Sequence, residues 1–415
     1  MTEIEIMKFG GKSLKELPYF GRAAEYIAGR VKADKRVVVT VSAMGPETNL
    51  LIEDAKQVYG GTLPLCCFRE RDKLLTIGEQ KSSALLAIAL MKLNIEAVSL
   101  SGLQIGLETD DNYGRAKIIR IENIHRVTEL LNQGKVVIVT GFQGVIRGTD
   151  ELVTLDIGGS DLTVLALTIA LKRKRCIKFT NIDGVFAIDP QIVPEAKRFK
   201  KITYSQMSQL ADAGTGVLMN RCVRLAQAYG IEIKVCLSPT LGKTTGGTLV
   251  CSGSTLENME TFVFPQSGVA IQKGICLVTI SDVPNQYGAA AKIFGALSHI
   301  NIIDCAQGQG GDKANISILC KTEYLHQILS TLKRVKEAKT IGEGVEVVGL
   351  TLVNPLMKDE PGWLYRVTNV IAKKKVNIEM LSSVGETIQV IVTKDSLESA
   401  ARALAEEFDL LTNNK

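Results

Sequence analysis

The stretch MKFGGKSL, Met7–Leu14, follows the apolar residues Ile4 and Ile6 and decides how the rest of the chain is interpreted. A β-rich run that ends in lysine and two glycines is typical of a strand-to-helix turn. Backbone N–H groups of paired glycines can approach an anion closely, and the positive end of a following helix adds to the attraction. Glycine is also the common residue in tight turns that bind nothing. Phosphate binding and a plain corner are therefore both open at this point.

The stretch 1–255 alternates β-rich runs with longer amphipathic ones, which predicts βαβ units and a largely parallel sheet covered on both faces. Ligands of such sheets bind at the carboxyl ends of the strands. We expect strands at Glu3–Lys8, Arg36–Val41, Ala97–Leu100, Val136–Thr140, Cys176–Thr180 and Ile233–Leu237. We expect helices at Tyr19–Ala33, Gln80–Leu93, Ala116–Asn132, Leu162–Leu171, Tyr204–Ala211 and Arg221–Tyr229.

The rest of the chain contains a weak internal repeat. Ser281–Ile303 and Pro355–Leu381 each have a strand, a turn with glycine, a helix, an Asn-Ile pair and another strand. Two copies of a β-α-β-β-α-β unit are the economical interpretation. The predicted domains are therefore 1–255, 265–340 and 345–412. The open sheet edges of such units commonly pair with a second copy.

Composition excludes several classes of protein. The net charge of +5 (49 Lys and Arg less 44 Asp and Glu) is too small to indicate nucleic acid binding. The nine cysteines show no CxxC pairs, which favours a reducing cytoplasmic setting and no zinc site. We see no signal peptide and no run of about 18 apolar residues, so no membrane span is expected.

Four turns with glycine fall where strands of the predicted sheet end: KFGGKS (8–13), VSAMG (41–45), GFQG (141–144) and DIGGSD (156–161). Lys8 stands at the end of the first strand, where an ammonium can neutralise charge on a phosphoryl group. Asp161 could hold that ammonium, or could simply cap the next helix. Glu79 is expected in the first turn of a helix, where it suits either the helix dipole or a substrate ammonium. The polar stretch Thr180–Phe199 could cover a nucleotide or be a surface connection.

Seven motifs in one order make the chain resemble the aspartate kinases of the amino acid kinase superfamily. The family pattern is K-F-G-G-T-S, V-S-A-M-G, D-x-L-L followed by G-E-Q, G-F-Q-G, G-R-G-G-S-D, T-D-V-D-G-V and D-P-R-I-V-P. Here the motifs are KFGGKS, VSAMG, DKLLTIGEQ, GFQG, DIGGSD, TNIDGV and DPQIVP. The resemblance covers essentially the whole chain, and the C-terminal part is similar to the two regulatory ACT domains of that family.

The resemblance implies an α/β fold: a three-layer amino acid kinase domain with a largely parallel central sheet, followed by two α+β, ferredoxin-like ACT domains. ATP with Mg²⁺ would phosphorylate the side-chain carboxylate of L-aspartate, the first step of lysine, threonine and methionine biosynthesis. No metal-ligand set within the chain is expected. Lys8 would stabilise the transferring phosphoryl group, with the amides of Gly10 and Gly11, and Asp161 would orient Lys8. The implied aspartate site is Ser42, Glu79 and Ser160, and the residues implied to frame ATP are Thr180, Asn181, Asp183, Phe186 and Asp189.

Several positions depart from the family pattern. The arginine of G-R-G-G-S-D, which pairs with a substrate carboxylate, is Ile157 here. The lysine of a later G-A-K-V-L-H-P-R stretch, which reaches the nucleotide phosphates, is Gly216, and the first aspartate of T-D-V-D-G is Asn181. The threonine of K-F-G-G-T-S is Lys12. We hypothesise that Lys12 replaces one lost charge in the substrate site. A Lys12→Thr variant with unchanged aspartate affinity and turnover would refute this hypothesis.

The first ACT unit also departs from its pattern, so inhibition by lysine or threonine is an expectation only. The candidate regulatory residues are Asp282, Gly288, Asn301, Ile302 and Gln309. The chain is expected to be a cytoplasmic homodimer or homotetramer joined through its ACT units. Two alternatives stay open: an amino-acid-sensing paralogue whose kinase site has decayed, and a kinase for another small carboxylate.

Overall fold

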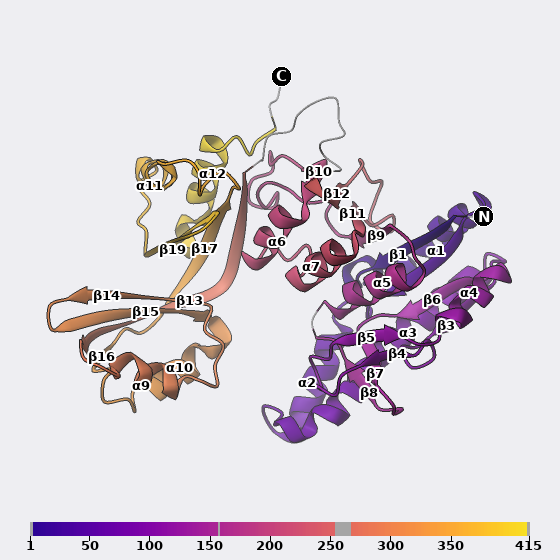
Figure 1. Ribbon diagram of the computed structural model, residues 1–415, viewed down its shortest axis with the longest axis horizontal. Helices are drawn as coiled ribbons and strands as arrows, with labels where there is room; N and C mark the ends of the chain where they lie inside the picture. The colour runs from indigo at the N-terminus through magenta and orange to yellow at the C-terminus, as the bar shows by residue number, and fades with distance from the viewer. Residues whose placement is uncertain (1–2, 157, 254–266, 413–415) are drawn as a thin grey trace. The chain divides into compact units, whose positions relative to one another are not determined.

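The computed structural model describes residues 3–156, 158–253 and 267–412 and divides into two compact units (Figure 1). The first unit comprises residues 1–185, 198–212 and 216–263. The second comprises 186–197, 213–215 and 264–415. The loop 186–197 therefore packs with the C-terminal part of the chain, although its neighbours in sequence belong to the first unit. Each unit is described by itself.

The first unit is built on an eight-stranded sheet in the order β10-β12-β11-β9-β1-β2-β6-β3. Its pairs are parallel except for β11 with β12. The expected sheet is confirmed, and all six predicted strands are present to within one residue. Because the chain proceeds from β1 to β2 on one side and later returns to β9 on the other, the strand order reverses at β1, where ligands of such sheets bind. The strands are β1 Ile4–Phe9, β2 Arg36–Val41, β3 Ala97–Leu100, β6 Val136–Thr140, β9 Arg175–Thr180, β10 Lys201–Thr203, β11 Glu232–Leu237 and β12 Thr248–Cys251.

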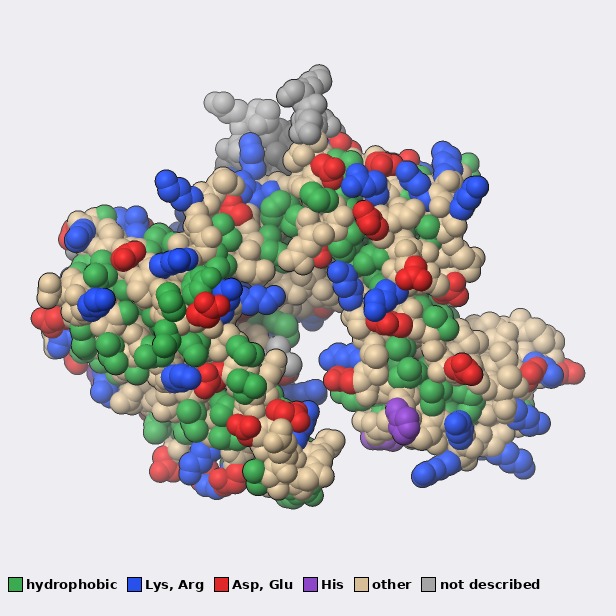
Figure 2. All heavy atoms as spheres, turned by 180° about the vertical axis from the view of Figure 1, so that it is seen from behind, with side chains coloured by type: hydrophobic (Ala, Val, Ile, Leu, Met, Phe, Trp, Pro, Cys, Tyr) green, Lys and Arg blue, Asp and Glu red, His purple; other side chains and the backbone are tan. Residues whose placement is uncertain are grey.

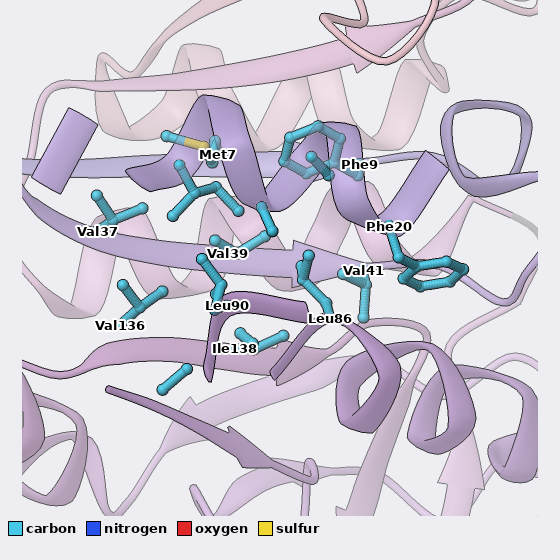
Figure 3. Close-up of a cluster of buried hydrophobic side chains, with 14 of the residues drawn as sticks. Met7, Phe9, Phe20, Val37, Val39, Val41, Leu86, Leu90, Val136 and Ile138 are labelled. Carbon is cyan, nitrogen blue, oxygen red and sulfur yellow. The ribbon is translucent and has the colours of Figure 1, made fainter. Parts of the chain in front are cut away.

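Alternate residues of β1 point to opposite faces of this sheet. Met7 and Phe9 enter an apolar cluster with helices α1 (Leu17–Lys32) and α3 (Phe68–Met91), and Figure 3 shows how their side chains meet those of β2 and β6. Lys8 points to the other face, which α5 (Gly159–Ala170) covers. Because its side chains alternate, strand β1 supplies core residues to one face of the sheet and the first candidate site residue, Lys8, to the other.

A second, four-stranded sheet in the order β5-β4-β7-β8 lies in the same unit. Its presence corrects two expectations. The predicted helix Ala116–Asn132 is a strand followed by a shorter helix, α4 (Ile124–Asn132), because the β-branched run Ile118–Ile121 pairs with β4. The DIGGSD turn follows β8 of this small sheet, so only three of the four glycine turns follow strands of the large one. The strands are β4 Leu107–Thr109, β5 Ile118–Ile121, β7 Gln143–Ile146 and β8 Leu152–Thr154.

Helix α3 is longer than predicted and begins at Phe68 rather than Gln80. The charged stretch Arg69–Lys73 conceals its first turns in the sequence. Together with the 3-10 turn η2 (Leu65–Cys67), it spans Leu65–Met91, which by length and composition alone is apolar enough to cross a membrane, although Glu79 and Lys81 interrupt its apolar residues. Half of its most apolar window is buried inside the fold, as in the core helix of a globular unit. The remaining helices of this unit are η1 Gly11–Leu14, α2 Glu47–Tyr59, α6 Tyr204–Asp212 and α7 Asn220–Tyr229.

The second unit contains one seven-stranded antiparallel sheet shared by the two repeats. The long strand β13 (Gly268–Pro284) pairs with β15, β16 and β17, with register shifts that divide it. Its second half belongs to the first repeat. Its first half, Gly268–Gln272, pairs with β17 and fills the fourth place in the sheet of the second repeat. A single continuous stretch of chain such as 345–412 therefore omits one of the four strands in the sheet of the second repeat. The other elements are α9 Ala289–Ala296, β14 Asp304–Gly310, β15 Lys313–Lys321, η3 Thr322–Tyr324, α10 Leu325–Leu332, β16 Thr340–Ile341, β17 Val345–Val353, α11 Trp363–Lys373, β18 Met380–Val384, β19 Thr387–Thr393, η4 Lys394–Ser396 and α12 Leu397–Glu407.

The surface carries charges of both signs, in keeping with the small net charge. Lys and Arg side chains are interspersed with Asp and Glu side chains over the face in Figure 2 rather than gathered by sign. The nine cysteines are all free thiols, and six of them are buried.

Candidate active site

Lys8 and Asp161 form a buried ion pair at the switch point of the large sheet. Lys8 Nζ lies 3.0 Å from Asp161 Oδ1. Asp161 is in the first turn of α5, and the turn ahead of it depends on Gly158, whose φ of 83° lies in the left-handed region that favours glycine. The DIGGSD turn therefore delivers a carboxylate to the end of β1.

A second lysine, Lys178 of β9, contacts the other oxygen of the same carboxylate. Lys178 pairs with Lys8 in the parallel register of β9 and β1, so the two side chains leave the sheet on the same face. Lys178 Nζ donates to Asp161 Oδ2 at 2.5 Å and to the carbonyl of Val217 at 2.6 Å. The candidate lysine–aspartate pair is thus a cluster of three charged groups.

The three groups are nearly enclosed and carry a surplus positive charge. Burial acts to raise the pKa of Asp161, but the ammonium groups of Lys178 and Lys8 outweigh it and hold that pKa below its ordinary value. Burial lowers the pKa of Lys8, with Asp161 opposing the shift and Lys178 adding to it. Two cations around one carboxylate suit a site that accepts an anion, since a buried charge is costly unless it is paired.

The glycine turns bring backbone and ammonium close together. A Cβ at Gly10 would lie 3.4 Å from Lys8 Nζ, and one at Gly11 would lie 2.8 Å from the carbonyl oxygen of Ala43. A Cβ at Gly141 would lie 2.5 Å from the side chain of Ser160. Close approach, not backbone conformation, therefore requires glycine at positions 11 and 141, whereas a Cβ at position 10 would only touch the Lys8 ammonium.

Glu79 approaches the cluster from α3. It lies in the middle of that helix, not in the first turn as predicted, so the helix dipole does not account for it. Its Oε1 accepts a hydrogen bond from the Ala43 N–H at 3.0 Å, and its buried Oε2 has no partner among the described residues. Burial raises the pKa of Glu79 to about 7, although that N–H and the charge of Lys8 oppose the shift. The ammonium group of a ligand could donate a hydrogen bond to this unpaired, buried carboxyl oxygen.

Lys8 and Glu79 border one pocket of about 950 Å³ in the first unit. Its wall includes Lys8, Ser42, Glu79 and Ser160, all of them predicted site residues. Phe142 and Asp156 also border it, with φ of 67° and 76°. Non-glycine residues with positive φ are costly and are concentrated at functional sites.

Asp72, the first residue of the DKLLTIGEQ motif, holds part of the pocket wall together, a role that the motif did not indicate. This fully buried residue of α3 pairs with Arg71 and accepts hydrogen bonds from the N–H groups of Gly114 and Thr154, at 2.6 and 2.9 Å. Arg71 and Arg115 both line the pocket, and Arg115 lies 3.8 Å from Asp156. Two arginines thus line the pocket.

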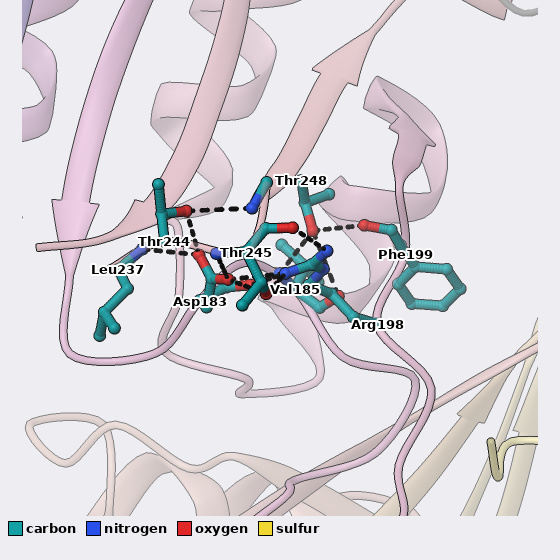
Figure 4. A network of polar contacts seen from close by, with 9 residues as sticks. Asp183, Val185, Arg198, Phe199, Leu237, Thr244, Thr245 and Thr248 are labelled. Atoms are coloured by element: carbon teal, nitrogen blue, oxygen red, sulfur yellow. Dashed lines mark hydrogen bonds and ion pairs between the residues drawn. The ribbon is translucent and has the colours of Figure 1, made fainter. Parts of the chain in front are cut away.

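Asp183, predicted to frame ATP, is engaged in a network of its own (Figure 4). Its Oδ1 accepts from the Leu237 N–H and the Thr244 hydroxyl, at 3.0 and 2.6 Å. Its Oδ2 accepts from Arg198 at 2.7 Å and from the N–H and hydroxyl of Thr245. In this structure Asp183 fastens the loop after β9 to the segment ahead of β12.

The other predicted residues are distributed as follows. Thr180 is the last residue of β9, and its hydroxyl donates to Asn181 Oδ1 at 3.3 Å. Phe186 and Asp189 belong to the second unit. Lys12 is exposed on η1 and does not line the pocket, whereas Gly216, with φ of 66°, has open space around it. Ile157 lies outside the described residues.

The candidate regulatory residues are all in the second unit. Asp282, with φ of 59°, lies at a register shift of β13 and pairs with Lys313 at 2.6 Å. Gly288 precedes α9 with φ of 81°, and Gln309 of β14 donates to Asn285 at 3.3 Å. Asn301 is exposed, and Ile302 packs against the core of the first repeat.

Sequence reasoning missed Lys178. A lysine inside the apolar run Cys-Ile-Lys-Phe is the signal that could have found it, because lysine is rarely buried unless it is paired.

Comparison with known proteins agrees with this architecture. The model of the amino acid kinase family matches residues 3–236, and an ACT domain model matches residues 350–408. The chain is 34% identical to the aspartokinase of Pseudomonas aeruginosa over 98% of its own length and 97% of that protein.

Two solved structures of Escherichia coli aspartokinase III share the fold. One, in complex with aspartate and ADP, has a TM-score of 0.74 at 21% identity, over 98% of this chain and 100% of that one. The other, in complex with lysine and aspartate, has a TM-score of 0.75 at 20% identity, with the same coverage. The fold and the lysine–aspartate site thus define an amino acid kinase with a C-terminal ACT region. Within that class, the chain belongs to the aspartokinase family and is an enzyme of that family.

Proposed function

We propose that this chain transfers the γ-phosphoryl group of ATP to the side-chain carboxylate of L-aspartate, giving 4-phospho-L-aspartate and ADP. One carboxylate oxygen bonds to the γ-phosphorus as the bond to the β–γ bridging oxygen breaks. The observation that carries this proposal is the surplus positive charge around Asp161, beside a pocket that holds Glu79. No covalent enzyme intermediate is needed, because the substrate carboxylate is itself the nucleophile.

Each site residue has a part in this reaction. Lys8 neutralises charge on the transferring phosphoryl group, and Asp161 keeps Lys8 in place. Glu79 binds the substrate ammonium through its unpaired oxygen. Ser42 and Ser160 on the pocket wall bind the polar groups of aspartate.

The residues fit a nucleotide phosphate, since Gly10 has no side chain beside the Lys8 ammonium. The nucleotide-framing roles of Thr180, Asn181, Phe186 and Asp189 belong to this proposal. Within the described residues, no group of three His, Cys, Asp or Glu side chains could hold a metal ion. We expect Mg²⁺ to arrive as MgATP, because Mg²⁺ commonly keeps its waters and takes phosphate oxygens as ligands.

Hydroxylamine trapping of the acyl phosphate, with ATP and a panel of small acids, tests the proposal. Product from aspartate alone supports it, and product from another acid assigns a different substrate. No product from any acid, despite binding of lysine or threonine, supports a sensing role. Lys8→Met should lower kcat by a factor of about 100 or more, and should remain folded because Lys178 still pairs with Asp161.

The wider setting also belongs to the proposal. An aspartokinase in complex with lysine supports lysine as an effector of the second unit, and threonine stays an expectation. Assembly into a homodimer or homotetramer would use the ACT region. The reaction would be the first step of lysine, threonine and methionine biosynthesis, in the cytoplasm.

A further inference from the structure

Lys178 has a position that a purely structural lysine does not need. Its side chain is about one-tenth exposed and meets a carboxylate already paired with Lys8. One lysine would neutralise Asp161, so the second brings a net positive charge into a nearly enclosed place. Such a charge is costly unless an anion joins it.

The hydrogen bonds of Lys178 leave it a free donor. An ammonium group has three N–H bonds. Within the described residues, two of them have acceptors: Asp161 Oδ2 and the carbonyl of Val217. The third has no acceptor among the described residues, and an oxygen of a ligand would satisfy it.

The strand places Lys178 on a different side of Asp161 from the pocket. Lys8, on Oδ1, lines the pocket proposed for aspartate, and Lys178, on Oδ2, does not. Lys178 shares its strand face with Thr180, two residues on, where β9 ends and the candidate nucleotide loop starts. An anion beside Lys178 therefore lies on the nucleotide side of Asp161.

We propose that Lys178 is a nucleotide-binding residue that contacts the phosphate chain, while Lys8 faces the acid that is phosphorylated. The inference rests on the proposed function and extends it, since it assigns a second phosphate-binding cation to β9. Position 216, where the family pattern has a lysine and this chain has glycine, adjoins the carbonyl that Lys178 contacts. In this chain the cation is therefore on strand β9, at Lys178, instead of on the loop that contains position 216.

Calorimetric titration of the full-length protein with ADP tests this assignment without turnover. Lys178→Met should weaken ADP binding about 10- to 100-fold, the range for loss of one charge-assisted contact. Lys178→Gln keeps amide N–H donors without the charge and should lose about as much, which makes it the second variant if the methionine protein does not fold. ADP affinity within twofold of wild type in a folded variant would overturn the proposal.

A charge-relocation variant separates ligand binding from a structural role. A Cβ at Gly216 meets nothing within 4 Å, so a side chain fits there. Lys178→Met with Gly216→Lys should recover at least tenfold of the lost ADP affinity. The matched control, Lys178→Met with Gly216→Ala, carries the same backbone strain and should recover none. Equal recovery in both, or in neither, contradicts the relocation.

The outcomes distinguish this inference from the proposed function. Normal ADP binding by the wild type without phosphorylation of aspartate refutes the function and leaves the Lys178 measurement valid. Aspartate phosphorylation with ADP affinity insensitive to Lys178 refutes only the inference. A wild type that binds no ADP refutes both.

Discussion

Replacing Glu79 with glutamine should change how stability depends on pH. The pKa of Glu79 is raised by burial from an ordinary 4.5 to about 7 in the folded protein. Between these values the folded state holds a proton that the unfolded state has lost, so the free energy of unfolding falls as pH rises. The contribution is fully present below about pH 4.5 and is lost as pH rises through about 7.

The magnitude follows from the shift. About 2.5 pH units at about 1.4 kcal/mol each give about 3.5 kcal/mol in total, of which about 3 kcal/mol falls between pH 4.5 and pH 8. Glutamine does not ionise, and it keeps an oxygen to accept the Ala43 N–H. The free energy of unfolding of Glu79→Gln, relative to wild type, should therefore rise by about 3 kcal/mol between pH 4.5 and pH 8.

Urea unfolding of both proteins at a series of pH values, followed by far-UV circular dichroism, measures this difference. Trp363 is the one tryptophan of the chain and lies in the second unit, so its fluorescence is an internal control that should not respond to Glu79. A difference between the two proteins that is independent of pH would refute the reasoning. In the enzyme assay, aspartate affinity of the wild type should increase as pH rises through about 7, because the substrate ammonium binds the ionised carboxylate.

Three further substitutions test the site. Gly141→Ala puts a Cβ 2.5 Å from the Ser160 side chain. It should raise the KM for aspartate at least tenfold with little change in ADP affinity. An unchanged KM would show that Ser160 does not take part in substrate binding. Asp183→Ala removes the acceptor for Arg198 and four further donors. It should lower the free energy of unfolding by about 3 kcal/mol, measured by urea unfolding. A decrease below about 0.5 kcal/mol would show that Asp183 does not hold the loop after β9 to the segment ahead of β12. Asp72→Ala leaves two backbone N–H groups without their acceptor. It should lower the free energy of unfolding by about 3 kcal/mol and weaken aspartate binding. Normal kinetics would show that the pocket wall does not depend on Asp72.

The sequence alone was enough to predict the elements whose pattern is local. Strand β1 alternates between core and site, and the glycines after it are adjacent in the chain, so the turn at Lys8 could be predicted from a few residues. The same holds for the other five predicted strands of the eight-stranded sheet. Motif order was enough to predict the aspartokinase family, which the comparisons confirm.

Tertiary structure decided the features that join distant segments. The strand β5 replaced a predicted helix because Ile118–Ile121 found a partner in β4. The second repeat takes its fourth strand from Gly268–Gln272, ahead of the first repeat. Lys178 meets Asp161 across 17 residues of chain only because β9 returns beside β1. Pairing of strands and burial of charge depend on what folding brings alongside, and a local pattern of residues does not contain that information.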